Sequence, residues 1–317
     1  MKTPQSLSMV TGLAVALSLG VTMPTQLEAQ RGGQRGGRDT TLQLTGTSVV
    51  DVTLSSGHLV VRSVDGTTGA VRGLRNDQRL RSTGVALTVV GRDEQRRSFS
   101  GSSSSRNRSD DVLEVDVPRG VRLVVNTRSG DVDVQEFAGD VEITTQSGTL
   151  QLAGVRGRVI AESVSGDITI TGAPSSVRIT TVSGDIGIRG ARGDVEIHTT
   201  SGDVRIDGEQ IPRLLVESMN ADVDFDGSLT DDARVQLSTH SGDVTLRLPE
   251  SQRGRIELST VSGDFSSGMP LIMAPNNIPS SNRGRATRRY ELGSGGKTQI
   301  DISTFSGDVR ILRGNRS

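Results

Sequence analysis

The chain lacks cysteine and tryptophan, and its aromatic residues are one tyrosine and five phenylalanines among 317 residues. The absence of cysteine excludes disulfide bonds, thiolate metal sites, cysteine nucleophiles and an acylated lipoprotein cysteine. Because aromatics are scarce, Leu, Ile and Val must supply nearly all of the hydrophobic core. A thin core of small aliphatic side chains favours stacked strands over a thick globule.

The chain also lacks a charge excess and a long apolar run. It has 36 Lys and Arg against 37 Asp and Glu, which argues against nucleic-acid binding through overall basicity. Its apolar stretch at residues 9–22 follows the basic Lys2 and precedes small residues up to Ala29. This stretch is shorter than the ~20 residues that span a bilayer. We therefore predict a signal peptide over residues 1–29, with an uncleaved anchor as the alternative and no later membrane span.

Export by this signal would place the mature chain in the periplasm, at the cell surface or outside the cell. Residues 30–39 (QRGGQRGGRD) follow the predicted cleavage site and carry Gly and Arg without an apolar pattern. We predict that they form a disordered linker.

Glycine is plentiful and recurs at a fixed interval. Ser-Gly pairs begin at Ser129, Ser147, Ser165, Ser183 and Ser201, always 18 residues apart, and most of them continue with Asp. The series drifts at residues 220–222 and resumes at residues 241–243, 262–264 and 306–308. A short fixed period of this kind is typical of solenoids.

Each repeat holds two short runs of alternating apolar and polar residues, which predict half-buried strands. Because side chains alternate faces along a strand, the nine-residue half-period requires the chain to bend once per half-repeat. Glycine tolerates the positive φ that such a bend needs. The predicted turn glycines are Gly130, Gly139, Gly148, Gly157, Gly166, Gly184, Gly193, Gly202, Gly242, Gly263 and Gly307.

Stacking the repeats in register aligns their inward residues in columns. The aliphatic columns are Val132, Leu150, Ile168, Ile186 and Val204, then Val134, Leu152, Ile170, Ile188 and Ile206, and on the facing sheet Val141, Val159, Val177 and Val195. A further inward column is hydroxyl throughout: Thr127, Thr145, Ser163, Thr181, Thr199, Ser218, Thr239, Thr260 and Thr304. We expect these hydroxyls to hydrogen-bond from coil to coil.

These patterns predict an all-β protein, a parallel β-solenoid (β-helix) with about 18 residues and two strands per coil, stacked in chain order. The regular solenoid is expected over residues 121–317, with an irregular insertion at about 266–297 whose apolar part, residues 269–274, covers the last coils. Residues 40–120 are expected to form a degenerate N-terminal coil and cap, interrupted by a polar loop at 92–111.

The Asp residues after the turns raise the possibility of calcium binding. Each turn offers one Gly and usually one Asp, so a full oxygen shell for an ion is not evident. We expect each carboxylate to accept hydrogen bonds from its own turn, with loosely held cations as the alternative. His198 and Glu217 are expected to be a solvated surface pair rather than an acid/base pair. We predict no catalytic residue, no metal or cofactor-binding residue and no cofactor.

Four segments carry a resemblance to a known family. They are residues 115–123 (VDVPRGVRL), 126–132 (NTRSGDV), 296–300 (GKTQI) and 303–309 (STFSGDV). The chain resembles, over about residues 40–315, a bacterial putative-adhesin family with a β-strand-repeat domain of unknown function. The resemblance implies a β-solenoid that is often exported and that has no established catalytic residues.

The expected function is that of a non-catalytic exported scaffold or interaction module, adhesin-like, which presents repetitive polar ladders. Its expected partner is an envelope polymer or a protein, and no nucleic acid. A β-helix carbohydrate-active enzyme, either a polysaccharide lyase or a hydrolase, is the alternative, with Glu162 and Glu217 as its candidate acids. End-to-end self-association of the solenoid is a third possibility.

Overall fold

The computed structural model describes residues 38–43, 48–74, 79–82, 86–90, 112–273 and 286–314. All of them belong to one compact unit, Gln34–Ser317. Every helix or strand assigned in these ranges is a β-strand, which confirms the predicted all-β class. The predicted signal peptide, the linker up to residue 37 and the polar loop at 92–111 lie outside the described residues.

The strands follow one another with short connections. In chain order they are β1 (Arg38–Gln43), β2 (Val49–Val64), β3 (Thr68–Leu74), β4 (Arg79–Ser82), β5 (Ala86–Val90), β6 (Val112–Pro118), β7 (Arg122–Gln135), β8 (Val141–Ser147), β9 (Leu150–Val155), β10 (Arg158–Ser165), β11 (Ile168–Gly172), β12 (Ser176–Thr180), β13 (Ile186–Ala191), β14 (Asp194–Ser201), β15 (Val204–Asn220), β16 (Val223–Ser241), β17 (Val244–Leu248), β18 (Gly254–Ser262), β19 (Phe265–Ser267), β20 (Leu271–Met273), β21 (Ala286–Leu292), β22 (Thr298–Ser306) and β23 (Val309–Arg313). β1 therefore begins within the last two residues of the predicted linker.

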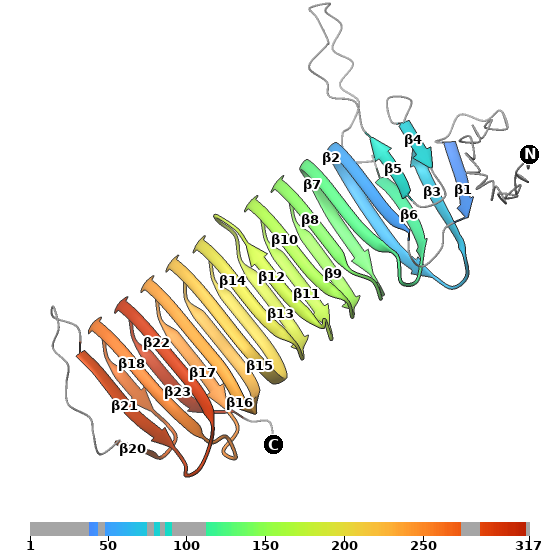
Figure 1. The fold of residues 1–317 in the computed structure, drawn as a ribbon. Coiled ribbons are helices and arrows are strands. Elements are labelled where there is room, and N and C mark those ends of the chain that lie inside the picture. Colours follow the sequence, from blue (N-terminus) through green and yellow to red (C-terminus); the bar gives the residue numbers. More distant parts are fainter. Residues whose placement is uncertain are drawn as a thin grey trace, which may run out of the picture. The chain divides into compact units, whose positions relative to one another are not determined.

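The regular part of the chain forms two parallel ladders of strands (Figure 1). One ladder runs through β7, β8, β10, β12, β14 and β15. The other runs through β7, β9, β11, β13, β15 and β16. Residues pair with partners one repeat away, as Val159 does with Val177 and Ile168 with Ile186. Each 18-residue repeat thus contributes one strand to each ladder.

The core lies between the two ladders and is built from the aliphatic columns. Val132, Leu150, Ile168, Ile186 and Val204 are consecutive register partners, each at most 2 % exposed. The facing column of valines from Val141 to Val195 is buried to the same extent. The columns predicted from the sequence are therefore stacked one above another, and they belong to one continuous hydrophobic cluster.

The chain bends at two glycine columns, of which the sequence analysis identified one. Positive φ is found at the Ser-Gly glycines Gly148, Gly166, Gly184, Gly202, Gly242, Gly263 and Gly307. The second bend lies at Gly154, Gly172 and Gly190 rather than at the predicted midpoints Gly139, Gly157 and Gly193, which keep ordinary φ, as does Gly130. At the midpoints glycine is required by close approach instead, because a Cβ on Gly157 would collide with the carbonyl oxygen of Gly139.

Two residues other than glycine also have left-handed φ in the described ranges, namely Glu136 and Gln210, whose φ is 56°. Glu136 precedes Gly154 by one repeat and has a φ of 51°, in the left-handed region. A non-glycine residue costs about 1–2 kcal/mol in this region. The repeats that contain Glu136 and Gln210 therefore carry local strain that glycine avoids at Gly154, Gly172 and Gly190.

The last two strands of the chain lie inside the stack rather than at its end. β22 pairs in parallel with β16 on one side and β18 on the other, and β23 pairs likewise with β17 and β19. Stacking in chain order, as the sequence predicts, is therefore wrong here. Because the coils carry the same Thr-x-Ser-Gly-Asp pattern, strand pairing alone does not dictate which coil follows which.

The N-terminal end has an equivalent arrangement. β2 lies between β7 on one side and β5 and β6 on the other, and all three pair with it in parallel. Beyond these parallel strands, β3 and β4 run antiparallel to β6 and β5, and β1 runs antiparallel to β3. At the other end, β21 runs antiparallel to β18. Antiparallel strands thus cover the parallel strands β5, β6 and β18.

The insertion predicted to be irregular contains regular structure in its described parts. β20 and β21 pair with each other in antiparallel orientation, and β21 covers the edge of β18. Met269 is buried in the core, whereas Ile272 and Met273 of the same segment are exposed. Strand pairing prevails over the prolines and glycines because an uncovered ladder edge would leave backbone groups unpaired. Residues 274–285 lie outside the described residues.

Candidate functional site at the Ser-Gly-Asp corner

The most regular polar feature of the molecule is the corner where each coil passes from one ladder to the other. Here the Ser of one coil is the register partner of the next Ser, as for Ser165, Ser183 and Ser201. The Asp that follows each Ser-Gly pair forms a second row parallel to the first. We call the set of these turns the Ser-Gly-Asp corner.

Six of the eight Asp residues of the corner use one oxygen to hold the adjacent coil. Asp167 Oδ1 accepts a hydrogen bond from the backbone N–H of Asp185 at 3.0 Å, and Asp185 Oδ1 accepts one from the N–H of Asp203 at 2.9 Å. Asp131 accepts equivalently from Thr149, which has no carboxylate to continue the row. The carboxylates therefore form a ladder along the stacking direction.

This ladder corrects the prediction that each Asp bonds within its own turn. The acceptors and donors belong to neighbouring coils, 18 residues apart in the regular region. The sharp turn at the preceding glycine, with a φ of 122° at Gly166 and Gly184, leads directly into the donating residue. The nearest carboxylate to this N–H is therefore that of the adjacent coil.

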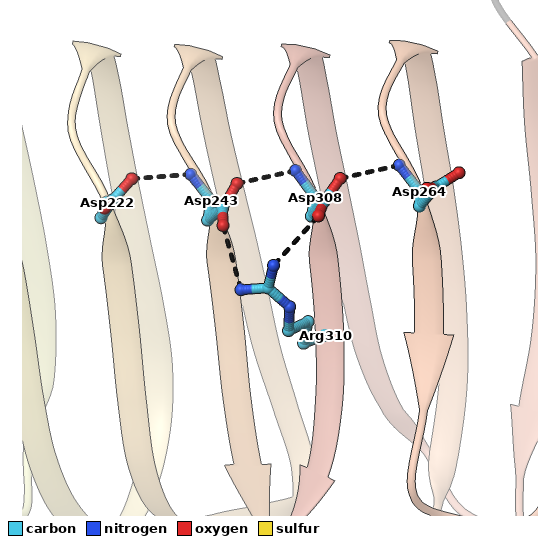
Figure 2. Close-up of polar contacts among 5 residues, drawn as sticks. All are labelled: Asp222, Asp243, Asp264, Asp308 and Arg310. Atoms are coloured by element: carbon cyan, nitrogen blue, oxygen red, sulfur yellow. Dashed lines mark hydrogen bonds and ion pairs between the residues drawn. The ribbon is translucent and has the colours of Figure 1, made fainter.

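Figure 2 shows the ladder where the chain order and the stacking order differ. Asp222 accepts from the N–H of Asp243, Asp243 from that of Asp308, and Asp308 from that of Asp264. Arg310 bridges two of these side chains, donating to Asp243 Oδ2 and Asp308 Oδ2 at 3.0 Å each. The inserted C-terminal strand is thus fixed by both backbone and side-chain bonds at this corner.

The Ser of each turn makes a further contact between coils. The hydroxyls of Ser165, Ser183 and Ser201 donate to carbonyl oxygens of the preceding coil, those of Gln146, Val164 and Val182, at 3.3–3.5 Å. These are long bonds and add little individually. They repeat in every coil of this region and run beside the carboxylate ladder.

The predicted hydroxyl column has the expected inward position but different partners. Thr127, Thr145, Ser163, Thr181, Thr199, Thr239 and Thr304 are all buried. The hydroxyls of Thr145, Ser163, Thr181, Thr199, Thr239 and Thr260 donate to the carbonyl oxygen two residues later in the same coil. The prediction of coil-to-coil bonding by these hydroxyls is therefore wrong, because the turn brings a carbonyl of their own coil closer.

A row of exposed apolar residues accompanies the corner. The residue before each Ser forms the column Arg128, Gln146, Val164, Val182, Thr200, Met219, His240, Phe305 and Val261, in stacking order. Five of the eight exposed large hydrophobic residues in the described ranges belong to it. Met219 is 60 % exposed and Phe305 47 %, and the ring of Phe305 stacks on that of His240 at 4.7 Å. We call this column the apolar ridge; no sequence criterion applied above identified it.

His198 and Glu217 are neighbours, as predicted, and a third group joins them. His198 Nδ1 lies 3.1 Å from Glu217 Oε2, and Nε2 lies 3.2 Å from Glu196 Oε1. The pKa of Glu196 is lowered from its usual value, chiefly by the hydrogen bond to His198. Burial opposes this effect and raises the pKa, and the charge of Arg178 lowers it further. Both imidazole nitrogens are occupied by partially exposed carboxylates, which describes a surface ion-pair cluster rather than an acid/base pair poised for substrate.

In the parts of the chain that the structure describes, no three His, Asp or Glu side chains converge as metal ligands would. One oxygen of Asp222, of Asp243 and of Asp308 is already engaged by a backbone N–H. Within the same ranges, no helix is long and apolar enough to cross a bilayer.

The chain matches the family described as Toastrack DUF4097 over residues 50–312, and it belongs to that family. This confirms the resemblance to a repeat domain of unknown function. A crystal structure of a "putative cell adhesion protein" from Clostridium sporogenes is similar, with a TM-score of 0.27 and 11% identity, covering 87% of this chain and 99% of that chain. A likeness at that TM-score carries no argument about fold or function. No curated protein matches the chain at a significant level.

Proposed function

We propose that the protein is an exported, non-catalytic interaction module, adhesin-like in character, that presents repeated side chains to an envelope polymer or a protein. The proposal includes the finer fold, a parallel β-solenoid whose coils hold about 18 residues and two strands. It is supported above all by the Ser-Gly-Asp corner, where the same side chains recur coil after coil in a fixed hydrogen-bonded row.

The surroundings of the corner support a display role. The aliphatic columns beneath it are almost completely buried, and both ladders are parallel and in register. Side chains on such a surface are held at the strand spacing of about 4.8 Å. In this proposal the turn glycines and the hydroxyl column are structural residues, and the exposed ends of the corner residues meet the partner.

Export is proposed from the N-terminal sequence, with its basic start and short apolar stretch before Ala29. Cell fractionation of a C-terminally tagged chain checks it, together with N-terminal sequencing of the mature protein. A mature chain that begins near Gln30 in an extracytoplasmic fraction is the expected outcome. Recovery of the unprocessed chain from the cytoplasm contradicts it.

The interaction role is tested by affinity capture from native envelope with the chain as bait. The matched control is the chain carrying Gly166→Val and Gly184→Val, which should not fold properly. We expect a component that only the folded bait retains and that binds saturably once purified. Incubation with a panel of polysaccharides tests the enzymatic alternative: products formed by the wild type but not by Glu217→Gln would refute a non-catalytic role.

A further inference from the structure

The exposed apolar residues of this protein are concentrated in one line. Val164, Val182, Met219, Phe305 and Val261 are between 41 % and 60 % exposed and all lie on the apolar ridge. Each of these apolar residues is followed by a Ser or, after Met219, by an Asn. These Ser and Asn residues are register partners, which places the apolar residues in successive or nearly successive coils. Single exposed hydrophobic residues are ordinary, but an aligned group marks an interaction surface.

A row of carboxylates runs beside this ridge. Within each coil the Asp follows the ridge residue by three positions, with only Ser and Gly between them, as in Val182-Ser183-Gly184-Asp185. The short Ser and Gly side chains leave both rows accessible. Ridge and carboxylates therefore form two parallel lines along the stacking direction.

The fold uses only part of the charge in this row. One oxygen of Asp131, Asp167, Asp185, Asp222, Asp243 and Asp308 accepts a backbone N–H. Arginine engages the second oxygen of Asp243 and of Asp308, and one oxygen of Asp203. The structure gives no ion pair, in the ranges it describes, to the exposed carboxylates of Asp131, Asp167, Asp185, Asp222 and Asp264. Like charges stacked at strand spacing repel one another, so a cationic partner would relieve a cost that the free protein carries.

The combined chemistry narrows the choice of partner. An anionic lipid surface or an acidic polymer would be repelled by the carboxylate row. A second copy docked through the same ridge in a two-fold arrangement would bring one carboxylate row towards the other. A neutral glycan would leave the carboxylates unpaired. A polypeptide that offers both apolar side chains and positive charges can cover the apolar ridge and pair with the carboxylate row.

We propose that the Ser-Gly-Asp corner is a docking surface for an extended cationic segment of a partner protein, whose apolar side chains cover the ridge and whose Lys or Arg side chains meet the free carboxylates. This inference rests on the proposed interaction role and specifies its surface and its partner. The central part of the surface is Val182, Met219, His240 and Phe305, flanked by Asp167, Asp185 and Asp222.

The test is fluorescence anisotropy of a labelled synthetic peptide of alternating Lys and Val titrated with the full chain. A Glu/Val peptide and a Lys/Ser peptide are the matched probes for charge and for apolar contact. We expect the Lys/Val peptide to bind with an affinity that falls as salt rises. The Glu/Val peptide should not bind, and the Lys/Ser peptide should bind at least about fivefold more weakly.

Two double variants locate the site on the protein. Asp167→Asn with Asp185→Asn keeps an oxygen acceptor for each backbone N–H but removes the charge, and Val182→Thr with Met219→Thr removes apolar surface. Each pair should weaken binding by about three- to tenfold with an unchanged melting temperature. The controls are Asp194→Asn, an exposed carboxylate on β14, and Ile272→Thr, an exposed apolar residue on β20. Neither control should change the affinity.

Equal binding by the corner variants, or equal binding of the Lys/Ser peptide, overturns this inference. The inference is also overturned if light scattering shows that the wild type is a dimer and that Met219→Asp makes it a monomer, because a second copy would then occupy the ridge. These results leave the interaction role itself intact if the envelope component is still captured. If the folded wild-type bait captures no envelope component, that result contradicts the interaction role instead.

Discussion

Gly184 and Gly187 lie in the same coil, and we expect opposite effects when each is replaced by alanine. Gly184 has a φ of 122°, which L side chains rarely adopt, and a Cβ there would collide with the carbonyl oxygen of Gly166 in the next coil. Gly187 lies in the middle of β13 with ordinary φ and has no atom within 4 Å of an added Cβ. The pair therefore separates the need for glycine at the corner from any general effect of adding a methyl group.

The expected magnitude follows from two contributions. The unfavourable backbone conformation costs about 1–3 kcal/mol. Relief of the collision requires the coils to separate, which weakens a hydrogen bond worth about 0.5–1.5 kcal/mol. Gly184→Ala should thus lower the free energy of unfolding by about 2–4 kcal/mol. Gly187→Ala should leave it unchanged or raise it by up to about 1 kcal/mol, because glycine weakens a strand interior.

The assay is urea unfolding of both variants and the wild type, followed by far-ultraviolet circular dichroism. A lower midpoint for Gly184→Ala alone supports the reasoning. If the two variants unfold at the same urea concentration, the corner does not require glycine and the bend argument fails. A changed slope for either variant would show that the protein no longer unfolds as one unit, and the midpoints of the first transition would then be compared.

Four further substitutions, at three carboxylates, test the electrostatics. Asp185→Ala should destabilise by about 1–3 kcal/mol because it leaves the N–H of the next coil unpaired, whereas Asp185→Asn should stay within about 1 kcal/mol of the wild type in thermal unfolding. Burial and then the neighbouring Glu257 raise the pKa of Asp301, so the charged form is disfavoured in the folded state. Asp301→Asn should therefore stabilise slightly at pH 7, by less than about 1 kcal/mol, and the gain should vanish as pH falls through the raised pKa. The pKa of Glu196 is lowered, first by His198, so its contribution is present above the usual carboxyl pKa and is lost as pH falls through the lowered one. Glu196→Gln should be less stable than the wild type at pH 7 by under about 1 kcal/mol, and equal stability at that pH would contradict the ion-pair assignment.

Features set by local periodicity could be predicted from the sequence. The repeat interval gives the register of Ile168 on Ile186, and the alternation gives their burial. The Ser-Gly repeat also locates the positive-φ bends at Gly166 and Gly184. The second bend was misplaced although its signal was present, because Gly154, Gly172 and Gly190 also recur every 18 residues. Gly139, Gly157 and Gly193 recur at the same interval, so the sequence offers two glycine columns for the second bend. The two columns differ only in φ and in their contacts, which are known from the structure.

Features that depend on contacts between coils could not be predicted. The partner of Asp185 is a backbone group of another coil, and the distance to it depends on the turn geometry. The inserted position of β22 and β23 has no local signal, because Thr304-Phe305-Ser306 resembles the equivalent segment of every coil. The apolar ridge was overlooked for a similar reason. Val182 and Met219 break no strand pattern, and their alignment is visible only after stacking.

The inserted position of β22 and β23 has a consequence for synthesis. These strands follow β18 and β19 in the chain, yet they form a layer between β16–β17 and β18–β19. Until β22 and β23 are synthesised, β18 can pair with β21 but lacks its parallel neighbour, so β18 and β19 must stay undocked from β16 and β17 or be displaced later. A premature stop after residue 297 would therefore remove a middle layer and leave two facing edges unpaired.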